Sequence, residues 1–332
     1  MKKLIRIWTT LGIIMAASSM TNAEMSNFIT YTAEGAGLSI DAVGLQNNTD
    51  GVVQADIPVG AQIYRAYLYS ASVWDDPLYD VQFEGMTLIS DAASRLDVGA
   101  KNTNVTSENR WDVTGLVNAK VGGGSGLFDF TVCELGYLDG EILSVIYSIP
   151  TEAVKTVMIF DGELSTTGDS FNVNLSPAFD GSDIIMSLGI SYSHQASQYT
   201  IVNVNGQRLT SSAGGEDDGF AKNGGLITAG GIGDSIANPI DPFAGPGGDP
   251  RYDDELYNLA PFLNIGDNLI SIDTLNPSHD DNVFFVGFEI PEPSTVALLA
   301  LGSLSLLRRR KNNQLSADRK KTTKTAFCAA VM

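Results

Sequence analysis

The sequence predicts an all-β protein built from two tandem, related β-sandwich units, with a signal peptide at the N-terminus and a transmembrane helix at the C-terminus. Three observations predict this organisation. Short alternating or apolar runs, separated by Gly, Asn and Asp, fill the body of the 332-residue chain and are typical of strands and turns. Four sequence blocks recur in the same order in the two halves. Each end of the chain carries an apolar segment beside basic residues.

Residues 1–23 have the three parts of a secretory signal peptide. Three basic residues stand in the first six positions, an apolar stretch follows, and small residues precede Ala23. The apolar stretch is too short to remain as an anchor helix across a bilayer. We therefore expect export of the chain, with signal peptidase cutting near Ala23.

The repeated blocks predict a duplication of one folding unit. Val81–Leu88 aligns without gaps on Val202–Leu209, and each segment reads as a strand, a glycine turn and a return strand. Three further blocks, which begin at Ile63, Trp111 and Asp139, parallel blocks that begin at Ile184, Leu256 and Asp280. We expect units at residues 30–150 and 155–290. The alternative is that two unrelated strand-rich segments have converged on similar composition.

The order of the blocks resembles the galactose-binding-like jelly roll that accompanies many glycoside hydrolases. The matching segments are Val202-Asn-Val-Asn-Gly206, Trp111-Asp-Val-Thr-Gly-Leu-Val117 and the strand that ends at Ile272. This resemblance implies a jelly-roll form for the units and makes binding of exopolysaccharide or other glycans an expectation. The motifs mark folding units rather than a sugar site, so the ligand-binding residues stay unknown.

The charge of the body excludes one class of partner. Residues 24–292 hold 38 acidic side chains against nine basic ones. Such a body repels phosphate backbones, so we expect no nucleic acid partner.

Residues that could perform catalysis are scarce. His194 and His279 are the only histidines of the chain, and the zinc-protease, phosphate-loop and dinucleotide motifs are missing from the sequence. We therefore expect a protein that is not an enzyme. Paired acids are common in the body, however, and a glycosidase needs only two carboxyl groups about 5–9.5 Å apart. A secreted carbohydrate-active enzyme, or its accessory carbohydrate-binding domain, is the alternative.

Clustered acids near turns favour calcium as a cofactor of the protein. Calcium takes six to eight oxygen ligands from carboxylates, amides and carbonyls. Asp280 and Asp281 are the first choice, with Asn276 and Asn282 as neutral oxygen donors. The alternative role for these acids is to keep the protein soluble.

The C-terminal segment has the physical properties of a short membrane anchor. Prolines at Pro291 and Pro293 stop the preceding strand, because they fix φ and remove backbone donors. The apolar run Val296–Leu307 would form a helix of about 18 Å, so its flanking residues must extend the span across a core of about 30 Å. The basic cluster Arg308, Arg309 and Arg310 should stay cytoplasmic.

This segment also resembles a PEP-CTERM sorting signal. The resemblance rests on Pro291-Glu292-Pro293, the apolar run and the arginines, within residues 291–311. It implies that an exosortase, a membrane-embedded cysteine transpeptidase, cuts near the motif and passes the body to the cell surface or the exopolysaccharide matrix. Such signals usually end just past the basic cluster. Here a basic tail, residues 312–332, follows, and we expect it to be cytoplasmic.

Together these features predict an exported protein that is held in the inner membrane before processing and then reaches the cell surface or matrix. We expect a structural, adhesive or glycan-binding role.

Overall fold

A computed structural model of the chain describes residues 25–45, 49–72, 79–96, 107–162, 169–191, 199–214, 226–244, 254–277 and 282–292. The predicted signal peptide with Ala23, the acids Asp280 and Asp281, and the chain from Pro293 onward lie outside these residues. Within the described ranges, none of the helices is long and apolar enough to cross a membrane.

The first unit contains two antiparallel sheets, with the orders β2-β10-β4-β8-β7 and β3-β9-β5-β6. Its elements are β2 (Gly37–Gly44), β3 (Asp50–Ile57), β4 (Gln62–Ser72), β5 (Val81–Phe83), β6 (Met86–Leu88), β7 (Arg95–Leu96), β8 (Ser107–Asp112), α1 (Thr114–Val121), β9 (Gly126–Glu134) and β10 (Gly140–Ser148). Alternate side chains of both sheets meet in one apolar core, as in a β-sandwich.

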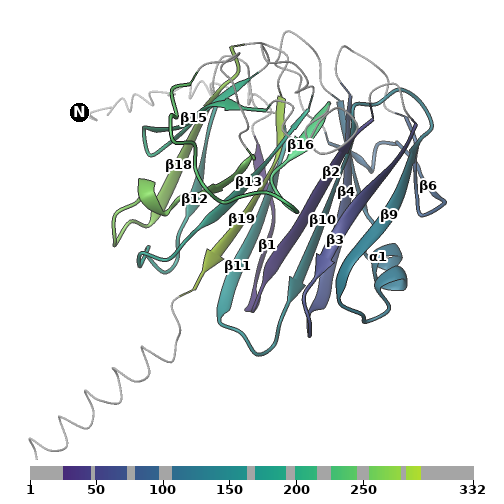
Figure 1. Cartoon of the computed structure of the whole chain (residues 1–332), viewed down its shortest axis with the longest axis horizontal. Coiled ribbons are helices and arrows are strands. Elements are labelled where there is room, and N and C mark those ends of the chain that lie inside the picture. Colours follow the sequence, from purple (N-terminus) through teal and green to yellow (C-terminus); the bar gives the residue numbers. More distant parts are fainter. Residues whose placement is uncertain are drawn as a thin grey trace, which may run out of the picture.

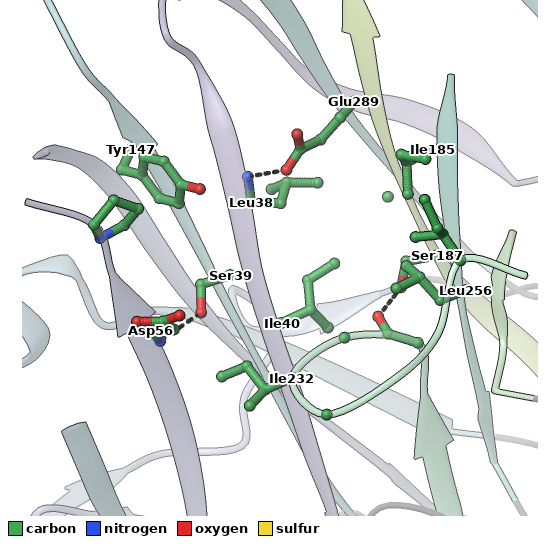
Figure 2. Close-up of a pocket in the computed structure, with 16 residues that line it drawn as sticks. Leu38, Ser39, Ile40, Asp56, Tyr147, Ile185, Ser187, Ile232, Leu256 and Glu289 are labelled. Carbon is green, nitrogen blue, oxygen red and sulfur yellow. Dashed lines mark hydrogen bonds between the residues drawn. The ribbon is translucent and has the colours of Figure 1, made fainter. Parts of the chain in front are cut away.

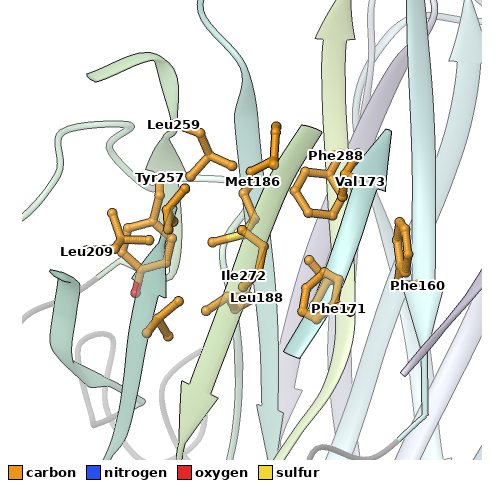
Figure 3. Close-up of a cluster of buried hydrophobic side chains, with 14 of the residues drawn as sticks. Phe160, Phe171, Val173, Met186, Leu188, Leu209, Tyr257, Leu259, Ile272 and Phe288 are labelled. Atoms are coloured by element: carbon orange, nitrogen blue, oxygen red, sulfur yellow. The ribbon is translucent and has the colours of Figure 1, made fainter. Parts of the chain in front are cut away.

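The second unit also contains two antiparallel sheets, with the orders β11-β19-β13-β16 and β12-β18-β14-β15, and β17 also pairs with β13. Its elements are β11 (Val154–Asp161), β12 (Asp169–Asn174), β13 (Ile185–Ser191), β14 (Thr200–Val204), β15 (Gln207–Ala213), β16 (Ile227–Ala229), β17 (Leu256–Asn258), η1 (Ala260–Phe262), β18 (Leu269–Leu275) and β19 (Asn282–Pro291). Figure 3 shows its core, in which Phe160, Phe171 and Phe288 pack between the sheets.

The outer sheets of the two units have the same strand order, and the inner sheets share three neighbouring strands, which confirms the predicted pair of related sandwich units. Strands β2, β10 and β4 lie side by side in the first unit, and β11, β19 and β13 take the same places in the second. The repeated blocks coincide with these equivalent strands. The block at Ile63 is β4 and the block at Ile184 is β13, whereas the Trp111 and Leu256 blocks are a strand followed by a short helix in each case.

The hairpins of the aligned segments are built alike. Glu84 and Gly85 turn the chain between β5 and β6, and Asn205 and Gly206 do so between β14 and β15, all with positive φ. The first turn residue then exchanges two hydrogen bonds with the neighbouring strand. Glu84 N donates to Thr131 O at 2.9 Å, and Thr131 N donates to the Glu84 carboxylate at 2.7 Å.

In the second unit the same two bonds join Asn205 to Ser271. Asn205 N donates to Ser271 O at 2.8 Å, and Ser271 N donates to Asn205 Oδ1 at 2.9 Å. A carboxylate in one unit and an amide in the other thus accept the equivalent backbone hydrogen bond from the neighbouring strand.

The inner sheets of the two units pack face to face, so the molecule has four layers (Figure 1). Their shared core includes Ile40 and Ile142 from the first unit and Ile159 and Phe284 from the second. One charged contact accompanies this apolar interface. Arg110 on β8 forms an ion pair with Asp161 on β11, and Tyr69 donates to the same carboxylate at 3.2 Å.

The first strand lies across the boundary between the units. Strand β1 (Ser26–Glu34) pairs along its length with β11, from Ser26 opposite Asp161 to Glu34 opposite Val154. Met25, which precedes it, is buried in the core of the second unit. The range 30–150 that we predicted for the first unit therefore begins inside a strand of the second unit's inner sheet. The two predicted ranges otherwise stay predictions.

Candidate functional site

A groove of about 420 Å³ lies where the two units meet, and we call it the junction groove. Strand β2 forms its floor with Leu38 and Ile40, and the second unit adds an apolar wall that includes Ile185, Ile232 and Leu256 (Figure 2). Cavities of this size at such junctions are the usual place for small-molecule sites.

The junction groove exists because β2 is an edge strand whose outward backbone groups bond to the second unit. Leu38 N donates to Glu289 Oε1 at 2.7 Å, and Ile232 N donates to Ile40 O at 2.9 Å. This close approach requires glycine at position 231, because a Cβ there would lie 2.1 Å from Ile40 O. Both bonds fix the floor and the wall relative to each other.

Polar groups gather at one end of the junction groove. They are the carboxylates of Asp56 and Glu289, the Ser39 hydroxyl and the Tyr147 phenol (Figure 2). Burial, followed by the charges of Glu289, Asp56 and Glu152, raises the pKa of Tyr147, so the phenol stays protonated and can donate a hydrogen bond. This end of the groove thus offers several hydrogen-bond acceptors and a phenol that donates, next to an apolar wall. Such a surface suits a neutral ligand with several hydroxyl groups and disfavours an anion.

A second polar cluster is buried inside the first sandwich. Glu134 on β9 and Glu141 on β10, which we call the buried glutamate pair, are 4% and 0% exposed. Desolvation raises the pKa of both carboxyl groups, and their mutual repulsion raises that of Glu134 further. The pair lies away from the junction groove, because both side chains point between the two sheets of the first unit.

The predicted calcium site is only partly within the described residues. Asn276 follows β18 and is buried, and Asn282 is the first residue of β19. The two acids that would carry the charge, Asp280 and Asp281, lie outside the described ranges, as do His194 and His279. Elsewhere, in the parts of the chain that the structure describes, no group of three or more His, Cys, Asp or Glu side chains is arranged to hold a metal ion.

The first residues of the predicted sorting signal are held against the second unit. Pro291 is the last residue of β19, opposite Lys155 on β11. Glu292 N donates to Val154 O at 3.0 Å, and Thr156 Oγ1 donates to Glu292 Oε1 at 2.6 Å. Pro291 and Glu292, the last residues that the structure describes, are therefore bonded to the inner sheet of the second unit.

Sequence reasoning missed the junction groove and the buried glutamate pair. A usable signal existed for the pair, because Glu134 continues the inward alternation of Phe130 and Val132. No local signal existed for the junction groove, because its residues come from seven separate segments that meet only after the units have packed together.

Comparison with known proteins identifies the C-terminal segment. Residues 289–311 match the PEP-CTERM protein-sorting motif, a span that includes Pro291 to Pro293 and Arg308 to Arg310. The chain is thus an exported protein. More particularly, it carries a PEP-CTERM sorting signal, which implies processing by an exosortase. No curated protein matches the chain.

Among solved structures, the chain is similar to a β-porphyranase of glycoside hydrolase family 86 from the human gut bacterium Bacteroides plebeius. The match has 10% identity and a TM-score of 0.23, and it covers 83% of this chain and 37% of that one. A likeness this slight defines neither a shared topology nor a shared activity.

Proposed function

We propose that the protein is delivered through its sorting signal to the cell surface or the exopolysaccharide matrix, where it serves as an adhesive, glycan-binding double sandwich. The observation that carries the proposal is the sorting motif at residues 289–311, which begins inside the last strand of the folded body. In this proposal the body folds outside the cytoplasm, the segment after Pro293 holds it in the inner membrane, and exosortase cleavage frees it.

The junction groove is the proposed glycan site. Hydroxyl-rich ligands need acceptors and donors in fixed positions together with an apolar surface for the ring carbons. Asp56 supplies an acceptor and Tyr147 a donor, and Ile232 and Leu256 supply the apolar surface. The groove's carboxylates favour a neutral or amino sugar over an acidic one.

Hydrolysis is the second candidate, and it rests on one observation. Two carboxylates, those of Asp56 and Glu289, line the same groove, as a glycosidase requires. Glu289 Oε1 is already occupied by the Leu38 N–H, however, and its Oε2 lies 3.5 Å from Lys155 Nζ. These contacts hold Glu289 as a fixed acceptor and favour binding over proton transfer.

The sorting step can be tested by replacing Pro291, Glu292 and Pro293 with alanine. We expect the full-length chain to accumulate in the inner membrane of a host that has an exosortase. Thr156→Val is the matched control, because it removes the hydrogen-bond partner of Glu292 without touching the motif. Unchanged release of the triple variant would remove the main argument for the proposal.

The binding step can be tested with a glycan array probed with the exported chain, with and without calcium. We expect neutral glycans to bind, and Asp56→Asn combined with Tyr147→Phe to weaken that binding about tenfold, the effect of losing about 1.4 kcal/mol. Asp129→Asn, which changes another exposed acid, is the control. Release of reducing sugar from a bound glycan, lost in Glu289→Gln, would favour hydrolysis instead.

A further inference from the structure

The buried glutamate pair faces one enclosed space from two different sheets. In β9, Phe130 and Val132 point into the core of the first sandwich, and Glu134 continues the same alternation. In β10, Leu143 points into that core, and Glu141 lies two residues before it on the same face. The carboxylates therefore meet between the outer and the inner sheet, near the end of the sandwich.

Most of the oxygens in this space have no partner. Neither carboxylate oxygen of Glu141 has a hydrogen bond, and Glu134 Oε1 has none. Glu134 Oε2 accepts one long bond from Leu138 N, at 3.4 Å. A buried polar group without a partner costs about 1–3 kcal/mol, and more when it is charged, so native proteins rarely leave one.

Hydroxyl groups from the neighbouring strand point into the same space. Ser70 on β4 lies directly opposite Glu141 in the antiparallel register and follows Leu68, which packs in the core, by two residues. Ser72 lies two residues further along the same face. Both serines are buried, and neither hydroxyl oxygen has a hydrogen-bond partner.

Within the described parts of the chain, no basic side chain forms an ion pair with either of the two acids. The ion pairs among the described residues join Arg110 to Asp161, Lys120 to Glu84 and Lys155 to Glu289, and none reaches the buried glutamate pair. Asp139, close enough to repel Glu134, adds further negative charge. A positive charge in this space would relieve the repulsion and satisfy the free oxygens at once.

We propose that the buried glutamate pair binds a calcium ion, with the hydroxyl groups of Ser70 and Ser72 as neutral ligands. The ligand set contains only hard oxygen atoms, which suits calcium and not zinc. Two carboxylates balance the charge of one divalent ion. If both bind in bidentate mode, they and the two hydroxyls supply about six oxygens, the lower end of the range that calcium takes. Magnesium would keep several waters, for which this enclosed space is unsuited.

The ion would tie the two sheets of the first sandwich together. Glu134 belongs to the outer sheet, whereas Glu141, Ser70 and Ser72 belong to the inner sheet. The ion would therefore cross-link the two sheets at one end of the sandwich, where β4 ends at Ser72 and β10 begins at Gly140.

Thermal unfolding of the full chain in detergent, first in EGTA and then in millimolar calcium, tests the proposal. We expect calcium to raise the Tm, magnesium to raise it less, and equilibrium dialysis to find calcium retained by the chain. Glu134→Gln combined with Glu141→Gln should abolish the calcium-dependent rise. In EGTA at neutral pH this variant should melt close to the wild-type temperature, because the raised pKa values keep the cation-free carboxyl groups protonated and a glutamine amide is likewise neutral.

Asp280→Asn combined with Asp281→Asn is the matched control, since it removes two acids at the other candidate calcium site. This variant should keep the rise that depends on the glutamate pair. Ser70→Ala is a smaller change and should weaken calcium binding several-fold in equilibrium dialysis. It keeps the proposal testable if the double glutamine variant does not fold. The proposal is overturned if calcium leaves the wild-type Tm unchanged, or if the whole rise survives in the glutamine variant.

Discussion

At the scale of single residues, one ion pair, in which the carboxylate is buried, joins the two units at their apolar junction. Asp161 is almost fully buried, and desolvation raises its pKa in spite of Arg110 beside it. The Arg110 guanidinium also lies 3.3 Å from the centre of the Phe28 ring, which comes from β1. One arginine of the first unit thus contacts two strands of the second unit's inner sheet.

Arg110→Gln should therefore destabilise the protein in a pH-dependent way. Without the cation, burial raises the pKa of Asp161 further, so the folded state holds a proton that the unfolded state releases. Stability then falls as the pH rises above the ordinary range of an aspartate. We expect a loss of about 2 kcal/mol at pH 7.5 and a clearly smaller loss at pH 4.5, measured by urea unfolding.

The control for this prediction is Lys120→Gln, which breaks the more exposed pair with Glu84 and should cost under about 1 kcal/mol. Equal losses for Arg110→Gln at both pH values would show that Asp161 is not the group that matters.

At the scale of elements, the two equivalent hairpins show which part of the fold is determined by the local sequence. An alternating strand, a turn with glycine in second place and a return strand are visible in Val81–Leu88 and Val202–Leu209, and both segments form the expected hairpin. The repeated strand order followed from such blocks. Strand β1 could not be placed in this way, because its partner β11 lies more than a hundred residues away and nothing in its own alternation selects that edge.

The candidate sites were harder to predict for the same reason. Glu141 stands in an apolar run, but its exposure depends on which sheet covers it, and Ser70 becomes its neighbour only through strand pairing. The sorting signal, by contrast, is contiguous in sequence and could be recognised without any fold.

Gly85→Ala and Gly206→Ala should each cost about 1 kcal/mol, because both glycines have positive φ, a region that disfavours residues with a Cβ. A methyl group at either position meets no atom within 4 Å, so the cost is purely conformational. Gly115→Ala is the control. Gly115 lies in α1 with equally open space, and alanine there should stabilise the protein by about 0.5–1 kcal/mol. Chemical unfolding that gave all three changes the same sign would contradict this account.

At the scale of the whole molecule, β1 and the face-to-face packing make the two units interdependent. The second unit's inner sheet ends with β1, which the chain makes before any part of the first unit. The connection from β1 to β2 is tight. Gly35 has a φ of +55°, and a Cβ there would lie 2.7 Å from Ile149, so the turn is held in place by the end of the first unit. The inner sheet of the second unit is therefore complete only when β1, from the start of the chain, pairs with β11, which follows the whole first unit in sequence.

Removal of residues 24–34 should test this interdependence, because it exposes the edge of β11 and takes Met25 and Phe28 from their contacts. We expect a loss of about 3 kcal/mol or more, from the burial of two large apolar side chains. Hydrogen exchange should rise first in β11 and not in the β5–β6 hairpin, which lies in the far outer sheet. A synthetic peptide of residues 24–34, added in excess, should restore protection of β11, whereas a peptide of scrambled order should not. Unaltered exchange in β11 after the deletion would show that β1 contributes nothing to that edge.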